Sequence, residues 1–398
     1  MATRCAKGPV VTEQLAGGDL SRLRQLNALA VVHVLRGRPA LTLTELSRDT
    51  GLSRPSTEDV VLQLQSQGWL EEVQPAPGVM GRPARRYRFR SDAGRVLGVD
   101  IGGHTIRVLA ADLDGEVGHT VRVPVAITAG RAERLRAVDA AIAQCLSVAG
   151  LTGADIWATT VGTSGLVDAA GRVVLSVAFP EWTGVQLAQH VGRLVGGTVL
   201  VENDSRLAAL AETWRGVARY AQHVVYLLAG LRTGTGLIID GKLHRGFAQA
   251  AGEIGALPEL GWIRAQEHLR SWTGAPAGTD PDDLAGYVFA SAREGDRKAV
   301  AVVRRYAKEL ALGASALVLA LDPQLVVLGG GFSRSADVLL EPLRREIEKR
   351  CVRIPEIVTS TLGDESVALG AVKLSLEHLQ EHLFDVRTGV AAPVRPAR

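Results

Sequence analysis

The chain has 398 residues, more than one hydrophobic core usually organises, so we expect two or three folding units. Its formal net charge is +3, but residues 1–95 hold 14 Lys and Arg against 9 Asp and Glu, which leaves the remainder slightly negative. A cationic N-terminal part favours a polyanionic partner through phosphate contacts. A near-neutral remainder suits small-molecule binding and self-association.

Cysteine use and hydropathy argue against two further classes of protein. Cys5, Cys145 and Cys351 are far apart and form no Cys-x-x-Cys pair, which argues against a disulfide framework or a zinc knuckle. The N-terminus lacks an apolar signal core, and the most apolar stretch, residues 310–321, is interrupted at Asp322, well short of a bilayer span. We therefore expect a cytoplasmic protein without a membrane partner, and a buried helix at residues 310–321.

The pattern near the N-terminus predicts a series of short helices. Residues 20–35 carry apolar side chains at helical spacing, and Gly37 closes the segment. Thr42 and Glu45 have the spacing of a capping box, so a short helix should run to about residue 50, where Gly51 supplies a tight turn. A third helix is expected to follow.

The third helix has the features of a recognition helix. Ser53 is its expected N-cap, and Pro55 is tolerated in the first turn. A helix N-terminus that carries hydroxyls and one guanidinium can lie against phosphates and base edges in a major groove. Glu58 and Asp59 would repel phosphates, although a carboxylate can accept a hydrogen bond from a cytosine amino group. The exposed residues at its start are expected to be Ser53, Arg54, Ser56 and Thr57.

An arginine-rich hairpin follows this helix. Residues 69–73 and 85–90 predict two strands of a β-wing, and Gly-Arg-Pro at 81–83 places Arg82 on a stiff, extended turn suited to a minor groove or a phosphate backbone. A charge run alone would usually be a solvated hairpin. Because three helices precede it, we interpret residues 20–92 as a winged helix-turn-helix DNA-binding domain after a flexible segment 1–19. Its predicted DNA-binding residues are Ser53, Arg54, Ser56, Thr57, Arg82, Arg85 and Arg86.

Glycine-containing motifs follow predicted strands in the remainder of the chain. Residues 96–99 lead into Asp-Ile-Gly-Gly at 100–103, a diglycine turn whose N–H groups can approach a phosphate while the acid can hold a metal ion through water. Alone this is weak evidence, since glycine turns between strands are common. Further motifs are Gly-Thr-Ser-Gly at 162–165, Glu-Asn-Asp at 202–204, Gly-Glu-Ile-Gly at 252–255 and Gly-Gly-Gly at 329–331.

The order of these motifs resembles the ROK family of repressors, open reading frames and kinases, and the resemblance spans nearly the whole chain, including the winged head of the repressor branch. It implies an α/β fold in which the head is followed by two actin-like or ribonuclease-H-like lobes that close on a sugar and a nucleotide. The body is expected at 93–387, with lobe 1 at about 93–202 plus the C-terminal helix and lobe 2 at about 203–360. A flexible tail is expected at 388–398.

The resemblance also implies roles for individual residues. Asp204 matches the carboxylate that deprotonates the sugar hydroxyl in family kinases, and Asn203 and Glu253 match sugar ligands; such a carboxylate can also act simply as an acceptor. Asp204 could instead be a helix N-cap, and Glu253 a solvated loop residue. The implied effector-binding residues are Gly165, Asn203, Asp204, Glu253 and Glu267, and the vestigial nucleotide-binding residues are Asp100, Gly102, Gly103, Thr105, Gly329 and Gly330.

Departures from the family pattern change the expected function. His104 stands where family kinases have threonine, and Leu231 and Arg232 occupy the second phosphate loop, where their side chains fill space needed for close backbone approach to a phosphate. Arg232 could bind an anion or pair with an acid. Ala256 replaces a histidine that contacts sugar and zinc, and His268 alone cannot form a zinc cage, so we expect no zinc and no resident cofactor.

These losses argue against phosphoryl transfer, which needs phosphate and acceptor positioned together. We expect a DNA-binding transcriptional repressor that responds to a sugar or sugar-like effector and forms a homodimer or homotetramer on double-stranded operator DNA. One alternative is a sugar kinase that uses ATP and Mg²⁺, with Asp204 as its catalytic residue, and carries a DNA-binding head. Another is an effector-independent DNA-binding oligomer.

Overall fold

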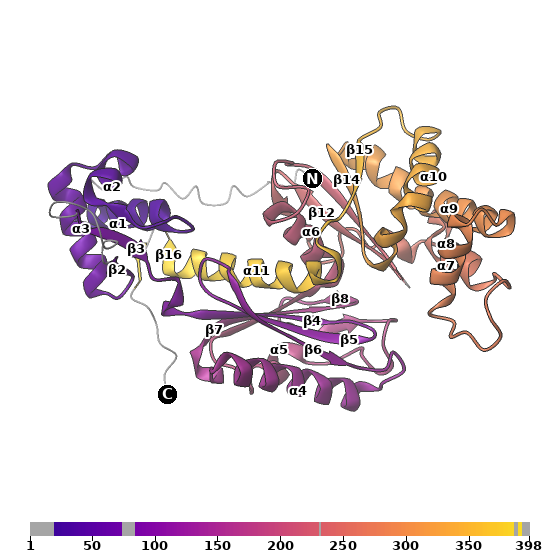
Figure 1. Ribbon diagram of the computed structural model, residues 1–398, viewed down its shortest axis with the longest axis horizontal. Coiled ribbons are helices and arrows are strands. Elements are labelled where there is room, and N and C mark those ends of the chain that lie inside the picture. Colours follow the sequence, from indigo (N-terminus) through magenta and orange to yellow (C-terminus); the bar gives the residue numbers. More distant parts are fainter. Residues whose placement is uncertain (1–19, 74–83, 231, 386–388, 392–398) are drawn as a thin grey trace, which may run out of the picture. The chain divides into compact units, whose positions relative to one another are not determined.

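The computed structural model describes residues 20–73, 84–230, 232–385 and 389–391, and these divide into two compact units (Figure 1). One unit, called the head below, comprises residues 20–93 and 380–391. The other, called the body, comprises the described residues between 94 and 379. The division falls within the last helix, α11 (Ser366–Leu383), so that helix belongs in part to each unit.

The head contains the three predicted helices and a small antiparallel sheet. The capping box is present, because the Thr42 hydroxyl accepts from the backbone N–H of Glu45 and the Glu45 carboxylate accepts from the Thr42 N–H at 2.7 Å. The helices are α1 (Leu20–Leu35), α2 (Leu43–Thr50) and α3 (Arg54–Ser66). The sheet has the order β1 (Leu41–Thr42), β3 (Arg86–Phe89), β2 (Leu70–Val73), and η1 (Ser91–Ala93) follows it.

The C-terminal residues complete the core of the head. The fully buried indole of Trp69 stacks on Phe89, with ring centroids 5.8 Å apart, and lies 4.9 Å from the ring of Phe384. The indole N–H donates to the carbonyl of Ala391 at 2.8 Å. Two short strands, β16 (Phe384–Asp385) and β17 (Gly389–Val390), pair in antiparallel fashion here. Residues 389–391, which the sequence analysis assigned to a flexible tail, thus take part in this packing.

The first lobe of the body is a five-stranded sheet with a helix on each face. Leu97 and Val161 pack with the buried face of α4, whereas Thr160, the neighbour of Val161, turns to the opposite face and hydrogen-bonds to Ser375 of α11 at 2.8 Å. The strands lie in the order β10 (Thr198–Asn203), β7 (Ile156–Thr163), β4 (Arg95–Ile101), β5 (Thr105–Ala111), β6 (Val117–Pro124). The remaining elements are α4 (Arg131–Ala149), η2 (Gly153–Asp155), β8 (Leu166–Val167), β9 (Val173–Leu175) and α5 (Leu187–Val191).

The second lobe repeats the topology of the first. In both sheets the first strand of the lobe lies in the middle, with an antiparallel meander on one side and two parallel strands on the other. The second sheet has the order β13 (Lys242–Leu243), β12 (Thr233–Ile239), β11 (Val224–Ala229), β14 (Leu325–Gly329), β15 (Glu356–Thr359). This internal repeat is that of the predicted actin-like fold.

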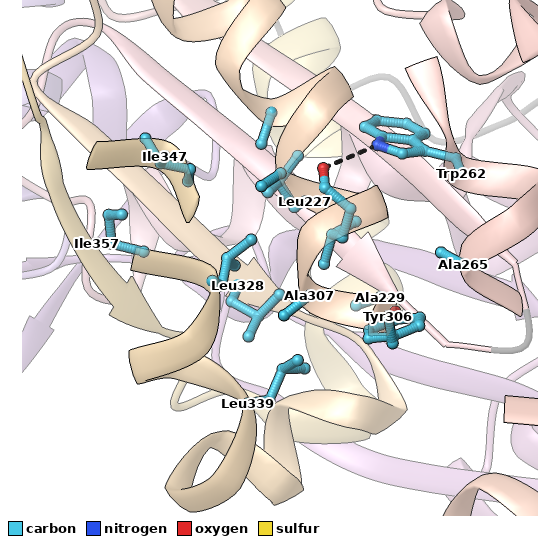
Figure 2. Close-up of a cluster of buried hydrophobic side chains, with 14 of the residues drawn as sticks. Leu227, Ala229, Trp262, Ala265, Tyr306, Ala307, Leu328, Leu339, Ile347 and Ile357 are labelled. Atoms are coloured by element: carbon cyan, nitrogen blue, oxygen red, sulfur yellow. Dashed lines mark hydrogen bonds between the residues drawn. The ribbon is translucent and has the colours of Figure 1, made fainter. Parts of the chain in front are cut away.

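Helices cover the second sheet and form a large buried cluster with it (Figure 2). Trp262 closes this cluster, and its indole N–H donates to the carbonyl of Leu310 at 3.1 Å. The predicted buried helix is part of α9, and among the described residues no helix is long and apolar enough to cross a membrane. The helices of this lobe are α6 (Asp204–Trp214), η3 (Ile254–Ala256), η4 (Pro258–Leu260), α7 (Trp262–Arg270), α8 (Leu284–Arg293), α9 (Arg297–Leu321), η5 (Gly331–Ser335), α10 (Ala336–Glu348) and η6 (Gly363–Glu365).

The contact between Trp69 and the C-terminal residues makes a prediction about the stability of the head. Phe384→Ala removes a buried ring from this cluster, so we expect the free energy of unfolding of the head to fall by about 3 kcal/mol. Urea unfolding followed by tryptophan fluorescence measures the change. Phe247→Ala is the matched control, because that ring is fully exposed and its loss should change little. Equal stability of the two variants would contradict the packing described here.

Candidate effector site and nucleic-acid interface

Asn203 and Asp204 lie where β10 ends and α6 begins. Asn203, not Asp204, is the N-cap of α6: its side-chain oxygen accepts from the backbone N–H groups of Ser205 and Arg206. Its amide nitrogen donates to the carbonyl of Gly165 at 3.1 Å. The cap fixes the start of the helix and leaves Asp204 as the first helical residue, with its carboxylate available beside the cap.

The carboxylate of Asp204 has an unusual environment. It accepts from the N–H of Ser205 at 2.7 Å, but burial and then the charge of Glu253 raise the pKa of Asp204 to about 7. Asp204 still keeps part of its surface exposed. A half-buried carboxyl that changes protonation near neutral pH can accept from a hydroxyl or share a proton with it, which is the chemistry required to bind a polyol.

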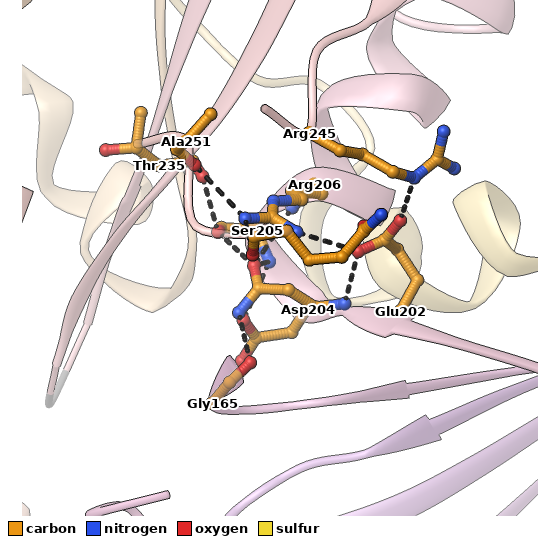
Figure 3. Close-up of polar contacts among 10 residues, drawn as sticks. Gly165, Glu202, Asp204, Ser205, Arg206, Thr235, Arg245 and Ala251 are labelled. Carbon is orange, nitrogen blue, oxygen red and sulfur yellow. Dashed lines mark hydrogen bonds and ion pairs between the residues drawn. The ribbon is translucent and has the colours of Figure 1, made fainter. Parts of the chain in front are cut away.

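A network of charged side chains around Glu202 holds the loop that leads to Glu253, and Figure 3 shows Glu202 with Arg206 and Arg245. The carboxylate of Glu202 is 4% exposed and pairs with Arg206 at 3.3 Å and with Arg245 at 2.5 Å. The other end of Arg206 donates to the carbonyls of Gln249 and Ala251, at 2.7 and 3.1 Å. These bonds position the loop that ends in Gly252 and Glu253. The sequence analysis missed this network, because Glu202 belongs to β10 and Arg206 to α6, and their pairing depends on how the chain turns at Asn203.

The backbone conformation at position 165 requires glycine. It has a φ of 115°, and a Cβ atom there would lie 2.4 Å from the carbonyl oxygen of Leu175. Only glycine fits, and its carbonyl then receives the amide of Asn203. Glu267 is not brought to this group: it is exposed on α7, while its neighbour Gln266 donates to the carbonyl of Gly230 at 2.9 Å.

The first glycine turn is braced from within the lobe. The N–H of Gly102 donates to the carbonyl of Thr105 at 3.0 Å, which closes the predicted turn between β4 and β5. Arg134 is fully buried in α4 and donates to the carbonyl of Gly102 at 2.7 Å and to that of Ala126 at 2.9 Å. Its guanidinium also lies 4.0 Å from the centre of the Phe179 ring. Sequence reasoning missed Arg134, because one arginine on an amphipathic helix is ordinarily exposed.

The environment of Asp100 does not fit a metal-bound nucleotide. Asp100 lies directly opposite Arg107 on the paired strand, and the two side chains form an ion pair at 3.3 Å. Burial raises the pKa of Asp100 to about 7 despite the opposing charge of Arg107. The guanidinium of Arg107 therefore binds the carboxylate of Asp100, which is the group expected to hold a metal ion through a water molecule. In the part of the chain that the structure describes, no group of three His, Cys, Asp or Glu side chains is arranged to bind a metal ion.

The expected second phosphate loop, near Arg232, and the glycine motif at 329–331 both contact other parts of the protein. Arg232, at the second segment, donates to the carbonyl of Ala178 in the first lobe at 3.4 Å; Leu231 lies outside the described residues. At the third, Gly329 packs against the Tyr226 hydroxyl and Gly330 has a φ of 77°. Thr105 begins β5.

Two of the predicted DNA-binding residues have structural roles in the head. Thr57 is fully buried and its hydroxyl donates to the carbonyl of Ser53 at 2.9 Å, so the prediction that it faces DNA is wrong. Arg86 donates to the carbonyl of Ala40 at 2.7 Å and pairs with Glu45 at 3.5 Å, which ties the wing strand to α2. Thr57 is therefore withdrawn from the surface, whereas Arg86 stays exposed with its guanidinium engaged by Ala40 and Glu45.

The remaining predicted residues form a smaller exposed set. Ser53 and Ser56 hydrogen-bond to each other at 2.9 Å, and the guanidinium of Arg54 beside them is exposed. Arg85 is exposed and lies 3.5 Å from Glu72. Arg82 lies outside the described residues. The sequence analysis also overlooked Gln63, an exposed amide on α3 of the kind that reads adenine in a major groove.

A helix-turn-helix head joined to a body of two actin-like lobes defines the class of this protein. The ROK family model matches residues 96–259 and 266–378, and the IclR helix-turn-helix domain model matches residues 26–74. The chain belongs to the ROK family.

Individual relatives include both regulators and kinases. The xylose repressor of Caldicellulosiruptor bescii is 24% identical, over 91% of this chain and 98% of its own length. The crystal structure of a ROK transcriptional regulator described as a homologue of E. coli MLC superposes with a TM-score of 0.64 at 18% identity, covering 89% of this chain and 97% of its own. A ROK glucokinase from Streptomyces griseus, in complex with glucose and AMPPNP, superposes with a TM-score of 0.58 at 26% identity, covering 71% of this chain and all of its own.

The raised pKa of Asp204 predicts how stability depends on pH. Between about pH 4 and pH 7 the native state holds a proton that the unfolded chain has lost, so this group lowers the free energy of unfolding as the pH rises through that window. Asp204→Asn removes the effect. The variant should gain about 1–2 kcal/mol relative to wild type between pH 4 and pH 8, allowing for the partial exposure of the group. Urea unfolding across that pH range measures the gain.

Asp168→Asn is the control of opposite sign. The backbone N–H of Arg172 lowers the pKa of Asp168, so its carboxylate contributes stability that is present above the unfolded pKa and lost as the pH falls. Removing it should cost a little stability at neutral pH and none in acid. A pH-independent difference for Asp204→Asn would contradict the assigned environment.

Proposed function

We propose that this protein is a cytoplasmic DNA-binding transcriptional repressor whose body binds a sugar or sugar-like effector without phosphorylating it. The observation that carries the proposal is the Arg107–Asp100 ion pair at the first glycine turn, in a chain that also has a helix-turn-helix head. The sugar side keeps Asn203, Asp204 and Glu253, while the nucleotide side has an arginine in place of a free acid. The body can therefore bind a sugar without phosphorylating it.

Two further features support this function. The xylose repressor of Caldicellulosiruptor bescii matches the chain along 98% of its own length, head and body together, whereas the glucokinase structure matches 71% of this chain. In the head, α3 presents exposed Arg54 and Gln63, which are side chains suited to phosphates and base edges.

An effector can regulate such a protein only by binding the DNA-competent and DNA-incompetent states with different affinity. A homodimer or homotetramer would place two heads on symmetric half-sites, which increases both affinity and specificity. The proposal therefore includes self-association, which analytical ultracentrifugation of the full chain measures directly.

The head makes a prediction about operator recognition. Arg54→Ala should weaken binding to the operator by about 1–3 kcal/mol and shift base preference or reduce the salt slope, because a guanidinium is lost from the start of α3. Fluorescence anisotropy with operators selected from genomic fragments measures affinity at several salt concentrations. Arg353→Ala in the body is the charge-matched control, since Arg353 is exposed and pairs with Asp322. Binding no tighter than to random DNA would refute the proposed function.

The body makes a prediction about catalysis. We expect no ADP release above buffer when the full chain is supplied with ATP, Mg²⁺ and a broad panel of sugars, because Arg107 pairs with the acid expected to hold the metal through water and Arg232 stands in the expected second phosphate loop. A ROK glucokinase assayed alongside provides the positive control. Turnover that Asp204→Asn abolishes would establish the kinase alternative instead.

A further inference from the structure

A cavity in the second lobe has no part in the function proposed above. It lies among α8, α9 and α10, which pack against one another (Figure 1), and it has a volume of about 390 Å³. A cavity of this size suits a small organic molecule. The apolar residues that line it are buried or half-buried, and they are Ala292, Val300, Val303, Val338 and Pro342.

The sequence explains why these three helices leave a space. Pro342 lies inside α10, where it has no N–H to donate to the carbonyl of Val338 and where its ring pushes the preceding turn away. On α8, Ala292 has only a methyl group with which to fill the gap. Directly beside these residues, Arg293 and Asp337 join α8 to α10 through two hydrogen bonds, one of them 2.7 Å long. This ion pair holds the two helices at a fixed separation next to the cavity.

The cavity lies across the second sheet from the candidate effector site. Side chains of β11 alternate between two clusters, so that Val225 packs with α8, α9 and α10, whereas Tyr226 packs with α6. Asp204 is the first residue of α6 and therefore belongs to the opposite face of the sheet. None of the residues that line the cavity is a predicted effector-binding residue. The two sites are separate.

Charged side chains also line the cavity, and basic ones are in excess. Arg345 pairs with Glu341 at 2.8 Å. The carboxylate of Glu346 is shared by Lys349, at 2.6 Å, and Arg350, at 2.8 Å. Both acids that line the cavity are therefore already bound by basic side chains of α10 or of the residues directly after it.

Arg304 carries a charge that these acids do not balance. It lies one turn after Val300 on α9, is exposed, and makes no hydrogen bond or ion pair with any residue that the structure describes. A neighbouring depression is lined by the same two residues and by Arg297. Residues 297–308 contain five Lys or Arg and no Asp or Glu, so this part of α9 supplies no counter-charge. A guanidinium offers two parallel N–H donors that match the oxygens of a carboxylate.

We propose that this cavity binds a small monocarboxylate with an aliphatic or aromatic body. The body packs against Val300, Val303 and Pro342, and the carboxylate accepts hydrogen bonds from Arg304. A sugar would lose hydrogen bonds to water against these apolar side chains without replacing them. A neutral apolar molecule would leave the guanidinium without a partner. This inference requires neither the DNA-binding head nor the site at Asp204.

Matched ligands test the inference by isothermal titration calorimetry on the full chain. The aliphatic ligands are butanoate, hexanoate, octanoate and neutral 1-octanol, and the aromatic pair is phenylacetate and phenylacetamide. Affinity should rise about threefold to fourfold for each CH₂ group that enters the cavity. Each acid should bind about tenfold more tightly than its neutral partner, because its hydrogen bond to Arg304 is charge-assisted, and added salt should reduce this preference. Octanoate that binds no more tightly than butanoate or 1-octanol, together with phenylacetate that binds no more tightly than its amide, would overturn the inference.

Variants assign the binding to the cavity. Arg304→Gln should weaken octanoate binding about tenfold and leave 1-octanol binding unchanged. Arg305→Gln is the matched control, because Arg305 is exposed at the next position of α9 and does not line the cavity. Val300→Phe places a ring in the cavity and should abolish binding of both ligands, while thermal unfolding shows whether the variant is folded. Arg304→Gln needs no change in the apolar lining, so it decides the matter if Val300→Phe does not fold.

Two further measurements distinguish other occupants and other sites. Asp204→Asn should bind octanoate like wild type, and loss of binding in this variant would place the ligand in the effector site and refute the inference. Equal octanoate affinity of Arg304→Gln and Arg305→Gln would also refute it. Sedimentation velocity tests whether a second copy of the chain covers the cavity. If Arg304→Gln dissociates a ligand-free oligomer that Arg305→Gln leaves intact, this face is an interface between copies and the cavity is not a carboxylate site.

Discussion

The buried carboxylate of Glu202 is the interaction on which the candidate site depends. It holds Arg206 and Arg245, and Arg206 in turn fixes the loop that carries Glu253. A buried ion pair of this kind contributes little net stability, because desolvation offsets most of the attraction. Its effect is geometric: without Glu202, Arg206 would keep an uncompensated buried charge and release the loop. The network therefore orders the acidic group around Asp204 before any ligand arrives.

A second group of charged side chains forms ion pairs and hydrogen bonds with the residues just before α11. In the first lobe, Arg107 donates to the carbonyl of Asp364 and Arg122 pairs with Glu365 at 2.9 Å; in the second lobe, Arg334 pairs with Asp364 at 2.8 Å. A change in the angle between the lobes must rearrange these bonds. Helix α11 begins directly after Glu365, and its last residues belong to the head. The chain itself therefore connects a rearrangement of these ion pairs to the DNA-binding unit.

The sequence was sufficient for the fold because the fold is encoded in local spacing. The capping box at Thr42, the Pro and Ser at the start of α3, and the strands before the glycine motifs at 100–103 and 162–165 are all short-range signals, and they all correspond to observed elements. Thr57 was misplaced even though the signal was present: it precedes Val60, Val61 and Leu64 at helical spacing, which assigns it to the buried face. The prediction relied on the hydrogen-bonding capacity of the Thr57 hydroxyl, although the helical periodicity of the apolar residues already placed Thr57 on the buried face.

Other features could not be read from the sequence, because they depend on partners far away in the chain. Nothing near residue 69 indicates that its indole will donate to a carbonyl at residue 391, and Arg86 gives no sign that Ala40 will accept from it. Arg134 likewise acquires its role only when the fold brings carbonyls of the glycine turn to it. Such contacts are fixed by topology, so the pattern of residue types predicts the elements but not these bonds.

The retention of Asp204 beside an altered nucleotide side is consistent with the physical difference between binding and catalysis. A sugar hydroxyl needs an acceptor of suitable geometry and charge, which the cap of α6 and the Glu202 network still provide. Phosphoryl transfer needs in addition a metal and a phosphate aligned with that hydroxyl, and small misplacements there cost orders of magnitude in rate. In the function proposed above, the pairing of Arg107 with Asp100 would affect only the second requirement. A body that binds a sugar without converting it keeps the ligand in the site unchanged. A regulatory switch needs such stable binding, whereas an enzyme must convert and release its substrate.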